Sequence, residues 1–232
     1  MKKNRILLLL LVLLFIFTAC GEKINTNETS IVIKKKNSII SAIIEDFDKD
    51  YYSEDEMKEY INKKIDDYNS SAGSKRISID TYDIKDGKAK VYLKFSSMRD
   101  YAEFNDVDFF NGSITEALIA GYDFDVEFKT VEDGKITGTE SADNIVEMRD
   151  YNVAIVSEAL PVFVPGTILY VSDGNVKVTG EKSVKVGFSK EAFEEESSEE
   201  ISSEEISTEE VSTIDISTEE KPVSKLAYIV YK

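Results

Sequence analysis

The chain has 232 residues, a net charge of −17, one cysteine, and neither histidine nor tryptophan. Without histidine it lacks the commonest general base and the commonest transition-metal ligand, so we expect no metal site and no cofactor. The negative charge argues against nucleic-acid binding, which needs clustered lysine and arginine, and a single cysteine allows no disulfide within the chain.

The chain begins with three cationic residues, followed by an apolar run over residues 6–17 and by Phe17-Thr18-Ala19-Cys20-Gly21. The run of about 12 apolar residues is shorter than the roughly 20 that a transmembrane helix needs. A secretory signal would also fit, but it needs no cysteine directly after the small residues. The order resembles the lipobox of bacterial lipoproteins, with Phe17 in place of the usual leucine or valine.

This resemblance implies that residues 1–19 are a signal peptide and that Cys20 becomes the mature N-terminus. The Cys20 thiol would carry a diacylglyceryl group, and two acyl chains are sufficient for stable membrane anchoring. Residues 20–30 would then be a tether between the lipid and the folded part. We therefore expect a protein anchored by lipid on the extracytoplasmic face of the cell membrane.

The folded part is predicted to begin with a β-hairpin. Two apolar runs, 31–33 and 39–44, flank a polar segment with Asn37 near the turn. A helix follows, because Ser53 and Glu56 have the spacing of a capping box and apolar residues recur behind them at helical period. The stripe consists of Met57, Tyr60, Ile61, Ile65 and Tyr68. We expect this long amphipathic helix to pack on the sheet.

Three Asp-Gly pairs lie between apolar runs, at residues 86–87, 133–134 and 173–174. Such pairs suit the tight turns of two-residue hairpins. The first pair predicts a hairpin between residues 77–84 and 91–95. Together the three pairs indicate antiparallel meanders rather than parallel βαβ units.

Short helices are predicted between the hairpins. Ser97 and Ser113 each have the context of a helix N-cap, and Glu116 completes a capping box with Ser113. Alternation over residues 124–128 predicts a strand, and residues 153–186 are rich in apolar β-branched residues that predict further strands. The expected fold class is α+β, mostly antiparallel sheet with one long helix and several short ones.

The segment 189–220 differs from the rest of the chain in composition. It carries twelve glutamates, one aspartate and one lysine, partly in degenerate repeats of five residues. A period of five fits neither a helix nor a strand, so we predict a disordered acidic insert. Residues 226–231 behind it have the pattern of a strand, which would be a liability if left unpaired. We expect one domain, 31–188, completed by a C-terminal strand within 225–231.

The alternation of Asp46, Asp48 and Asp50 resembles the first half of an EF-hand calcium loop. The rest of the motif is missing, because Tyr51 stands where the turn glycine belongs and Met57 where the bidentate glutamate belongs. The three aspartates are more simply the polar exit of a strand that leads to the helix cap, so no metal ligand is assigned.

Two aromatic pairs, Tyr51-Tyr52 and Phe109-Phe110, suggest a sugar-stacking or peptide-binding surface. Against this, Tyr52 has a structural role at the start of the helix, and at least one ring of the second pair is expected in the core. No catalytic motif based on serine, cysteine or a phosphate-binding loop occurs, so no catalytic residue is assigned. A carboxylate pair for glycoside hydrolysis remains open.

Several segments, together with the lipobox, resemble uncharacterised lipoproteins of anaerobic Gram-positive bacteria. They are Glu45-Asp46-Phe47, Ala120-Gly121-Tyr122-Asp123, residues 168–174 and Tyr228-Ile229-Val230-Tyr231-Lys232. The resemblance implies a location and no activity. We expect a non-enzymatic interaction or envelope-associated module, bound to the membrane through lipid on Cys20 and to an unknown envelope protein or ligand. A small-ligand or glycan-binding lipoprotein is the alternative, and a carboxylate-based hydrolase a third.

Overall fold

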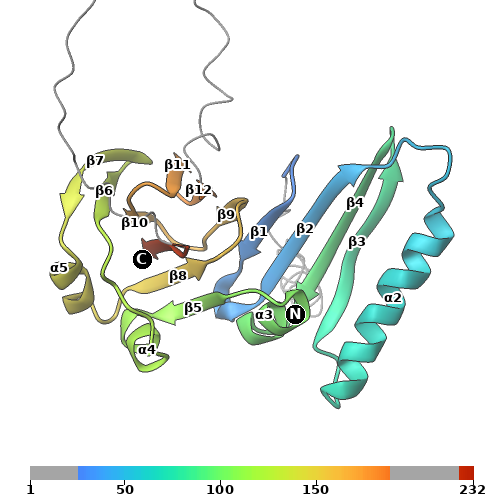
Figure 1. Cartoon of the computed structure of the whole chain (residues 1–232), viewed down its shortest axis with the longest axis horizontal. Coiled ribbons are helices and arrows are strands. Elements are labelled where there is room, and N and C mark those ends of the chain that lie inside the picture. Colours follow the sequence, from blue (N-terminus) through green and yellow to red (C-terminus); the bar gives the residue numbers. More distant parts are fainter. Residues whose placement is uncertain (1–25, 189–224) are drawn as a thin grey trace, which may run out of the picture.

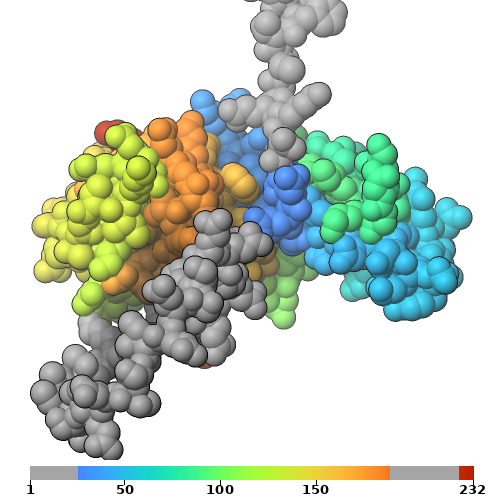
Figure 2. All heavy atoms as spheres, turned by 90° about the horizontal axis from the view of Figure 1, so that it is seen from above, coloured from blue at the N-terminus to red at the C-terminus, as the bar shows by residue number. Residues whose placement is uncertain are grey.

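The computed structural model describes residues 26–188 and 225–232, which form two β-sheets with helices packed around them (Figure 1). The expectations for the signal peptide 1–19, for lipidation of Cys20 and for the acidic insert 189–220 lie outside these residues. The fold class is mixed α+β with antiparallel sheets, as predicted. Viewed from above, the described residues form one elongated body (Figure 2).

The first sheet has seven strands in the order β11-β12-β9-β1-β2-β4-β3. Their bounds are β1 Ser30–Ile33, β2 Ile39–Asp46, β3 Ile77–Lys85, β4 Lys88–Phe95, β9 Pro161–Phe163, β11 Val176–Gly180 and β12 Ser183–Val186. Among the described strands, only β1 and β9 pair in parallel, with Ile31 opposite Val162. This one parallel pair joins the N-terminal hairpins to strands from late in the sequence.

The second sheet has six strands in the order β5-β8-β13-β10-β6-β7. Their bounds are β5 Phe109–Ser113, β6 Phe128–Glu132, β7 Lys135–Glu140, β8 Asn152–Val156, β10 Ile168–Ser172 and β13 Ala227–Tyr231. The helical segments are η1 Lys35–Asn37, α2 Glu54–Ser71, α3 Met98–Asn105, α4 Ile114–Ile119 and α5 Ala142–Glu147.

Two of the three Asp-Gly pairs close hairpins as predicted. Asp86 and Gly87 have φ values of 54° and 74°, and Asp133 and Gly134 have 49° and 73°, the positive values that a type I′ turn requires at both central residues. The hairpin expectation for residues 173–174 was wrong. Only Gly174 has a positive φ there, and the chain passes from β10 in one sheet to β11 in the other.

The predicted caps of the short helices are confirmed. The side chain of Ser97 accepts a hydrogen bond from the N–H of Asp100 at the start of α3. At α4, Ser113 and Glu116 form both halves of a capping box. These bonds satisfy N–H groups that have no partner within the helix.

The strand expected at residues 124–128 begins only at Phe128. Before it, the N–H of Val126 bonds to the carbonyl of Phe124 in a tight turn. The Phe124 ring lies 5.2 Å from the ring of Tyr228 and 6.4 Å from that of Phe128. The alternation therefore reflects the packing of these rings at the entrance to β6 rather than a longer strand.

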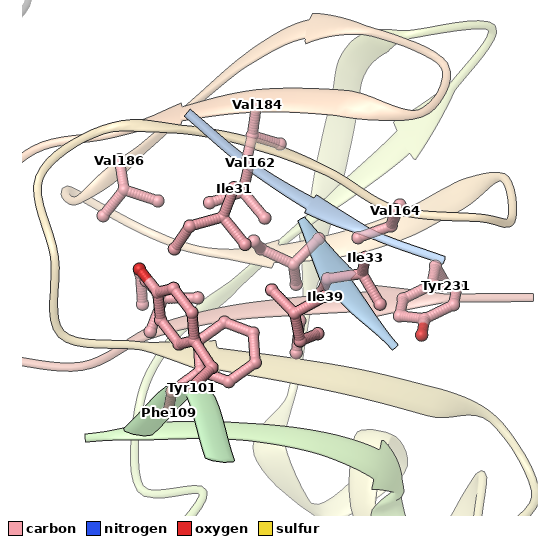
Figure 3. Packing of buried hydrophobic residues seen from close by; sticks show 14 of the residues in the cluster. Ile31, Ile33, Ile39, Tyr101, Phe109, Val162, Val164, Val184, Val186 and Tyr231 are labelled. Carbon is pink, nitrogen blue, oxygen red and sulfur yellow. The ribbon is translucent and has the colours of Figure 1, made fainter. Parts of the chain in front are cut away.

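The main hydrophobic core lies where the inner faces of the two sheets meet (Figure 3). It includes Ile31, Ile33 and Ile39 from one sheet and Phe109 and Tyr231 from the other. A second cluster lies on the opposite face of the six-stranded sheet, under α4 and α5. At the far end of the seven-stranded sheet, α2 covers β3 and β4, with Ile65 buried against them (Figure 1). This arrangement leaves the first turns of α2 at one end of the molecule, where the candidate site lies.

Candidate binding cleft

The loop 47–53 connects β2 to α2 and is fixed at both ends. The N–H of Phe47 donates to the carbonyl of Gly87, in the turn between β3 and β4, over 2.7 Å. At the other end, the Ser53 hydroxyl accepts from the N–H of Glu56 and caps the helix. The Tyr82 hydroxyl of β3 also donates to the carbonyl of Glu54 over 3.0 Å. The helix start is thus bound to the sheet, and a cleft remains between them.

This cleft, named here the aromatic cleft, has a volume of about 510 Å³. Its walls come from the end of β2, the start of β4, the loop and the first turns of α2. The lining residues are Ile43, Glu45, Asp46, Phe47, Tyr51, Tyr52, Ser53, Glu56, Met57, Tyr60, Ile61, Ala89 and Val91. Most of them are apolar or aromatic, which is typical of ligand sites.

Three tyrosines of the aromatic cleft are exposed to solvent. Tyr51 is 78% exposed, Tyr52 42% and Tyr60 62%. They make up half of the large apolar side chains that are exposed in the described residues, the others being Leu118, Ile119 and Ile136. Single exposed apolar residues are common, but a group around one hollow marks an interaction site.

The rings at the mouth contact one another. The Phe47 and Tyr52 ring centroids lie 5.0 Å apart with the planes tilted by 31°, and the Tyr51 ring meets Tyr52 edge-on at 4.9 Å and 75°. The pKa of Tyr52 is raised, first by the neighbouring Tyr51 and then by loss of solvent and by nearby carboxylates. The Tyr52 phenol is therefore neutral at physiological pH.

Carboxylates supply the charge of the lining, through Glu45, Asp46 and Glu56. The Nζ of Lys88 lies 2.7 Å from Asp46 Oδ1, and this contact lowers the pKa of the Asp46 carboxyl. The hydroxyl of Thr29 donates to Glu45 over 3.0 Å. No lysine or arginine is among the lining residues, so the cleft is apolar with a negative rim.

A second hollow lies between the later turns of α2 and β3, with a volume of about 780 Å³ and a mainly polar lining. The Asn69 side chain in its lining holds the backbone at the start of β3. The Asn69 amide donates to the carbonyl of Ile77 over 2.9 Å and accepts from the N–H groups of Arg76 and Ile77. With its polar atoms engaged in this way, this hollow is the weaker candidate.

The aspartates of the calcium hypothesis do not converge. Asp46 pairs with Lys88, and Asp48 pairs with the neighbouring Lys49 at 3.2 Å. Within residues 26–188 and 225–232, no three carboxylates come together in a group that would hold a metal ion. The arrangement fits the strand exit rather than an EF-hand.

The two aromatic pairs differ in their exposure to solvent. Tyr51 and Tyr52 lie at the mouth of the aromatic cleft, whereas Phe109 and Phe110 are each only 6% exposed. Successive residues of a strand point to opposite faces, so Phe109 enters the main core and Phe110 the cluster under α4. The second pair is core and forms no binding surface.

Tyr60 was assigned by its spacing to the buried stripe of the helix, and this was wrong. Adjacent residues of a helix lie about 100° apart, so Tyr60 lies at the edge of the stripe when Met57, Ile61 and Ile65 are at its centre. Ile61 packs against the core while Tyr60 remains 62% exposed. Phe47 was missed because a single aromatic residue in a polar segment gives no periodic signal.

A glycoside hydrolase needs a carboxylic acid of raised pKa near a second carboxylate. Burial clearly raises the pKa of Glu158. This residue accepts a hydrogen bond from the Tyr101 hydroxyl over 2.7 Å and does not line the aromatic cleft. The carboxyl of raised pKa therefore does not belong to the aromatic cleft.

Comparisons with protein families, with curated proteins and with solved structures found no match for this chain. In the part of the chain that the structure describes, no helix is both long and apolar enough to cross a membrane.

Proposed function

We propose that this protein is a non-enzymatic binding module, held by lipid on Cys20 at the extracytoplasmic face of the cell membrane. Its binding surface is the aromatic cleft. The observation that carries this proposal is the group of exposed tyrosines, Tyr51, Tyr52 and Tyr60, around one hollow beside an ordered helix cap. Rings held in this way offer large contact area at a low cost in conformational entropy.

The long helix has two roles in this proposal. As an amphipathic element, α2 places Ile61 and Ile65 against the sheet and presents Tyr60 and Glu56 to the cleft. The lipid on Cys20 and the residues that lead from it to β1 keep this surface close to the membrane, where the partner is another component of the envelope.

The test is capture from the solubilised envelope of the source organism, using the chain from Gly21 onward, which contains every described residue. The test variant combines Tyr51→Ala and Tyr60→Ala. The matched control combines Leu118→Ala and Ile119→Ala, which removes two exposed apolar side chains from α4 instead. Quantitative mass spectrometry compares what each protein retains.

We expect the wild type and the α4 control to retain the same components, and the cleft variant to lose them by at least about tenfold, since aromatic residues dominate interface energies. Equal retention by all three proteins would refute the aromatic cleft as the binding surface. A retained glycan in place of a protein would support the alternative of a glycan-binding lipoprotein.

A further inference from the structure

The charge around the aromatic cleft indicates what kind of partner it accepts. Residues 45–59 carry eight carboxylates and two lysines, a net charge of −6. Three of these carboxylates, Glu45, Asp46 and Glu56, belong to the lining, which has no cationic side chain of its own. Asp46 is paired with Lys88 from outside the lining, so Glu45 and Glu56 are the carboxylates that face a ligand. The positive end of the α2 dipole amounts to about half a charge, which is too little to neutralise this rim. An anionic ligand would be repelled.

Two tyrosines of this region, the exposed Tyr60 and the half-buried Tyr82, already hold cations of the chain itself. The Nζ of Lys64 lies 5.7 Å from the centre of the Tyr60 ring, and the Nζ of Lys58 lies 5.2 Å from that of Tyr82. Ring faces attract ammonium and guanidinium groups within about 6 Å. The Lys64 ammonium on Tyr60 therefore stands where a cation of a partner would bind.

The apolar part of the cleft needs a different kind of side chain. Phe47, Met57 and Val91 line it together with the rings of Tyr51 and Tyr52, and these surfaces favour aliphatic or aromatic groups. Tyr51 and Tyr52 meet at 75°, so these two rings do not form one flat platform for sugar stacking. The combination of apolar walls and a negative rim matches a segment that is both cationic and apolar.

We infer that the aromatic cleft binds a peptide segment of a partner protein in which lysine or arginine alternates with aliphatic or aromatic residues. This inference rests on the proposed function and names the chemistry of its partner. The cationic groups contact the Glu45 and Glu56 carboxylates and the Tyr60 ring, while the apolar side chains enter between Phe47 and Met57. Electrostatic complementarity of this kind gives specificity for charge sign.

The experiment is isothermal titration calorimetry of the chain from Gly21 onward with three probes. The first is a short capped peptide of alternating lysine and leucine, the second replaces lysine with glutamate, and the third is a neutral chitin oligosaccharide. We expect only the first to bind. Its affinity should fall by roughly tenfold when salt rises from about 0.05 M to about 0.5 M, because salt screens exposed charges.

Two matched variants test the site. Glu56→Gln removes a carboxylate from the lining and should weaken the lysine peptide by about three- to tenfold, since a favourable charge contact is lost. Glu59→Gln removes the same charge one turn further along the helix, outside the lining, and should change the affinity by less than about twofold.

The inference is overturned if the lysine peptide fails to bind, if the glutamate peptide binds equally well, or if Glu56→Gln and Glu59→Gln have equal effects. Binding of the oligosaccharide alone, lost in the Tyr51→Ala/Tyr60→Ala variant, would overturn it while leaving the proposed function intact. Failure of the proposed function is read separately, from the envelope capture.

Discussion

Three tyrosines at the aromatic cleft remain in solvent although burial of a large side chain stabilises a fold by about 1.5–3 kcal/mol. Tyr51, the most exposed of them, contacts Tyr52 through its ring edge. Phe110, by contrast, lies in a core cluster and contributes to stability. At the scale of single residues, the exposed rings contribute little to the fold and are available for binding.

Glu158 is a partly buried carboxyl group whose charged form is disfavoured in the folded state. Its carboxyl is partly buried and accepts a hydrogen bond from Tyr101 over 2.7 Å. Burial raises the pKa of Glu158 above its ordinary value of 4.5, although the bond from Tyr101 lowers it. Its contribution to stability is therefore present below pH 4.5 and is lost as the pH rises through the folded-state pKa.

Glu158→Gln removes this charge and retains an oxygen that can accept from Tyr101. We expect the variant to melt roughly 1–3 °C above the wild type at pH 7 and at the same temperature as the wild type near pH 4. Calorimetric melts across this range measure the difference. A constant difference at all pH values would show that the effect is not one of titration.

Glu116→Gln is the control of opposite sign. Bonds from the N–H and the hydroxyl of Ser113 lower the pKa of Glu116. Its contribution is present above pH 4.5 and is lost as the pH falls through the folded-state pKa. This variant should melt below the wild type at pH 7, with the difference shrinking toward pH 4.

At the scale of elements, the turns and helix caps were the features that the sequence predicted best. The turns at Asp86 and Asp133 and the caps at Ser97 and Ser113 depend on residues that are close in sequence, and the structure has all of them. The pair at residues 173–174 has similar local chemistry but joins two sheets, because β10 before it pairs with β6 and with the distant β13, whereas β11 after it pairs with β12 in the other sheet.

β13 is the element that joins the end of the chain to its middle. It lies between β8 and β10, and all five of its residues are buried. Polar contacts fix it at both ends. The N–H of Tyr228 donates to the Ser172 hydroxyl over 2.9 Å, and the Tyr231 hydroxyl donates to the buried Asn111 over 2.7 Å.

Removal of residues 226–232 should abolish cooperative unfolding. Burial of the four large side chains of β13 contributes about 1.5–3 kcal/mol each, which together is comparable with the roughly 5–15 kcal/mol of a whole domain. Circular dichroism melts measure this. A truncated chain that still melts cooperatively near the wild-type temperature would contradict this role of β13.

Deletion of residues 194–220 is the control for this truncation, since it removes more of the chain but retains every described residue. Longer loops cost little, about 0.6 kcal/mol for each doubling of length. We therefore expect this variant to melt cooperatively within a few degrees of the wild type. A large loss of stability would contradict the interpretation of this segment as an insert within one domain.

At the scale of the whole molecule, the sequence predicted strands and their antiparallel character but not their division into two sheets. The parallel contact of β1 with β9 joins residues about 130 positions apart, and no local pattern encodes such a pair. The aromatic cleft was partly foreseen, through the Tyr51-Tyr52 pair. Its other walls come from β2, β4 and α2, so only the assembled fold shows that these rings surround a hollow.

The central claim is that this fold presents its aromatic cleft at the outer face of the membrane. This proposed location depends on the lipid anchor at Cys20. The most direct measurement is mass spectrometry of the N-terminal peptide of the protein isolated from membranes of its source organism, with Cys20→Ala as the control. For the wild type we predict a peptide that begins at an acylated Cys20. For the variant we predict release from the membrane fraction or accumulation as the uncleaved precursor. An unmodified Cys20, or a processed variant that stays in the membrane fraction until detergent is added, would contradict it.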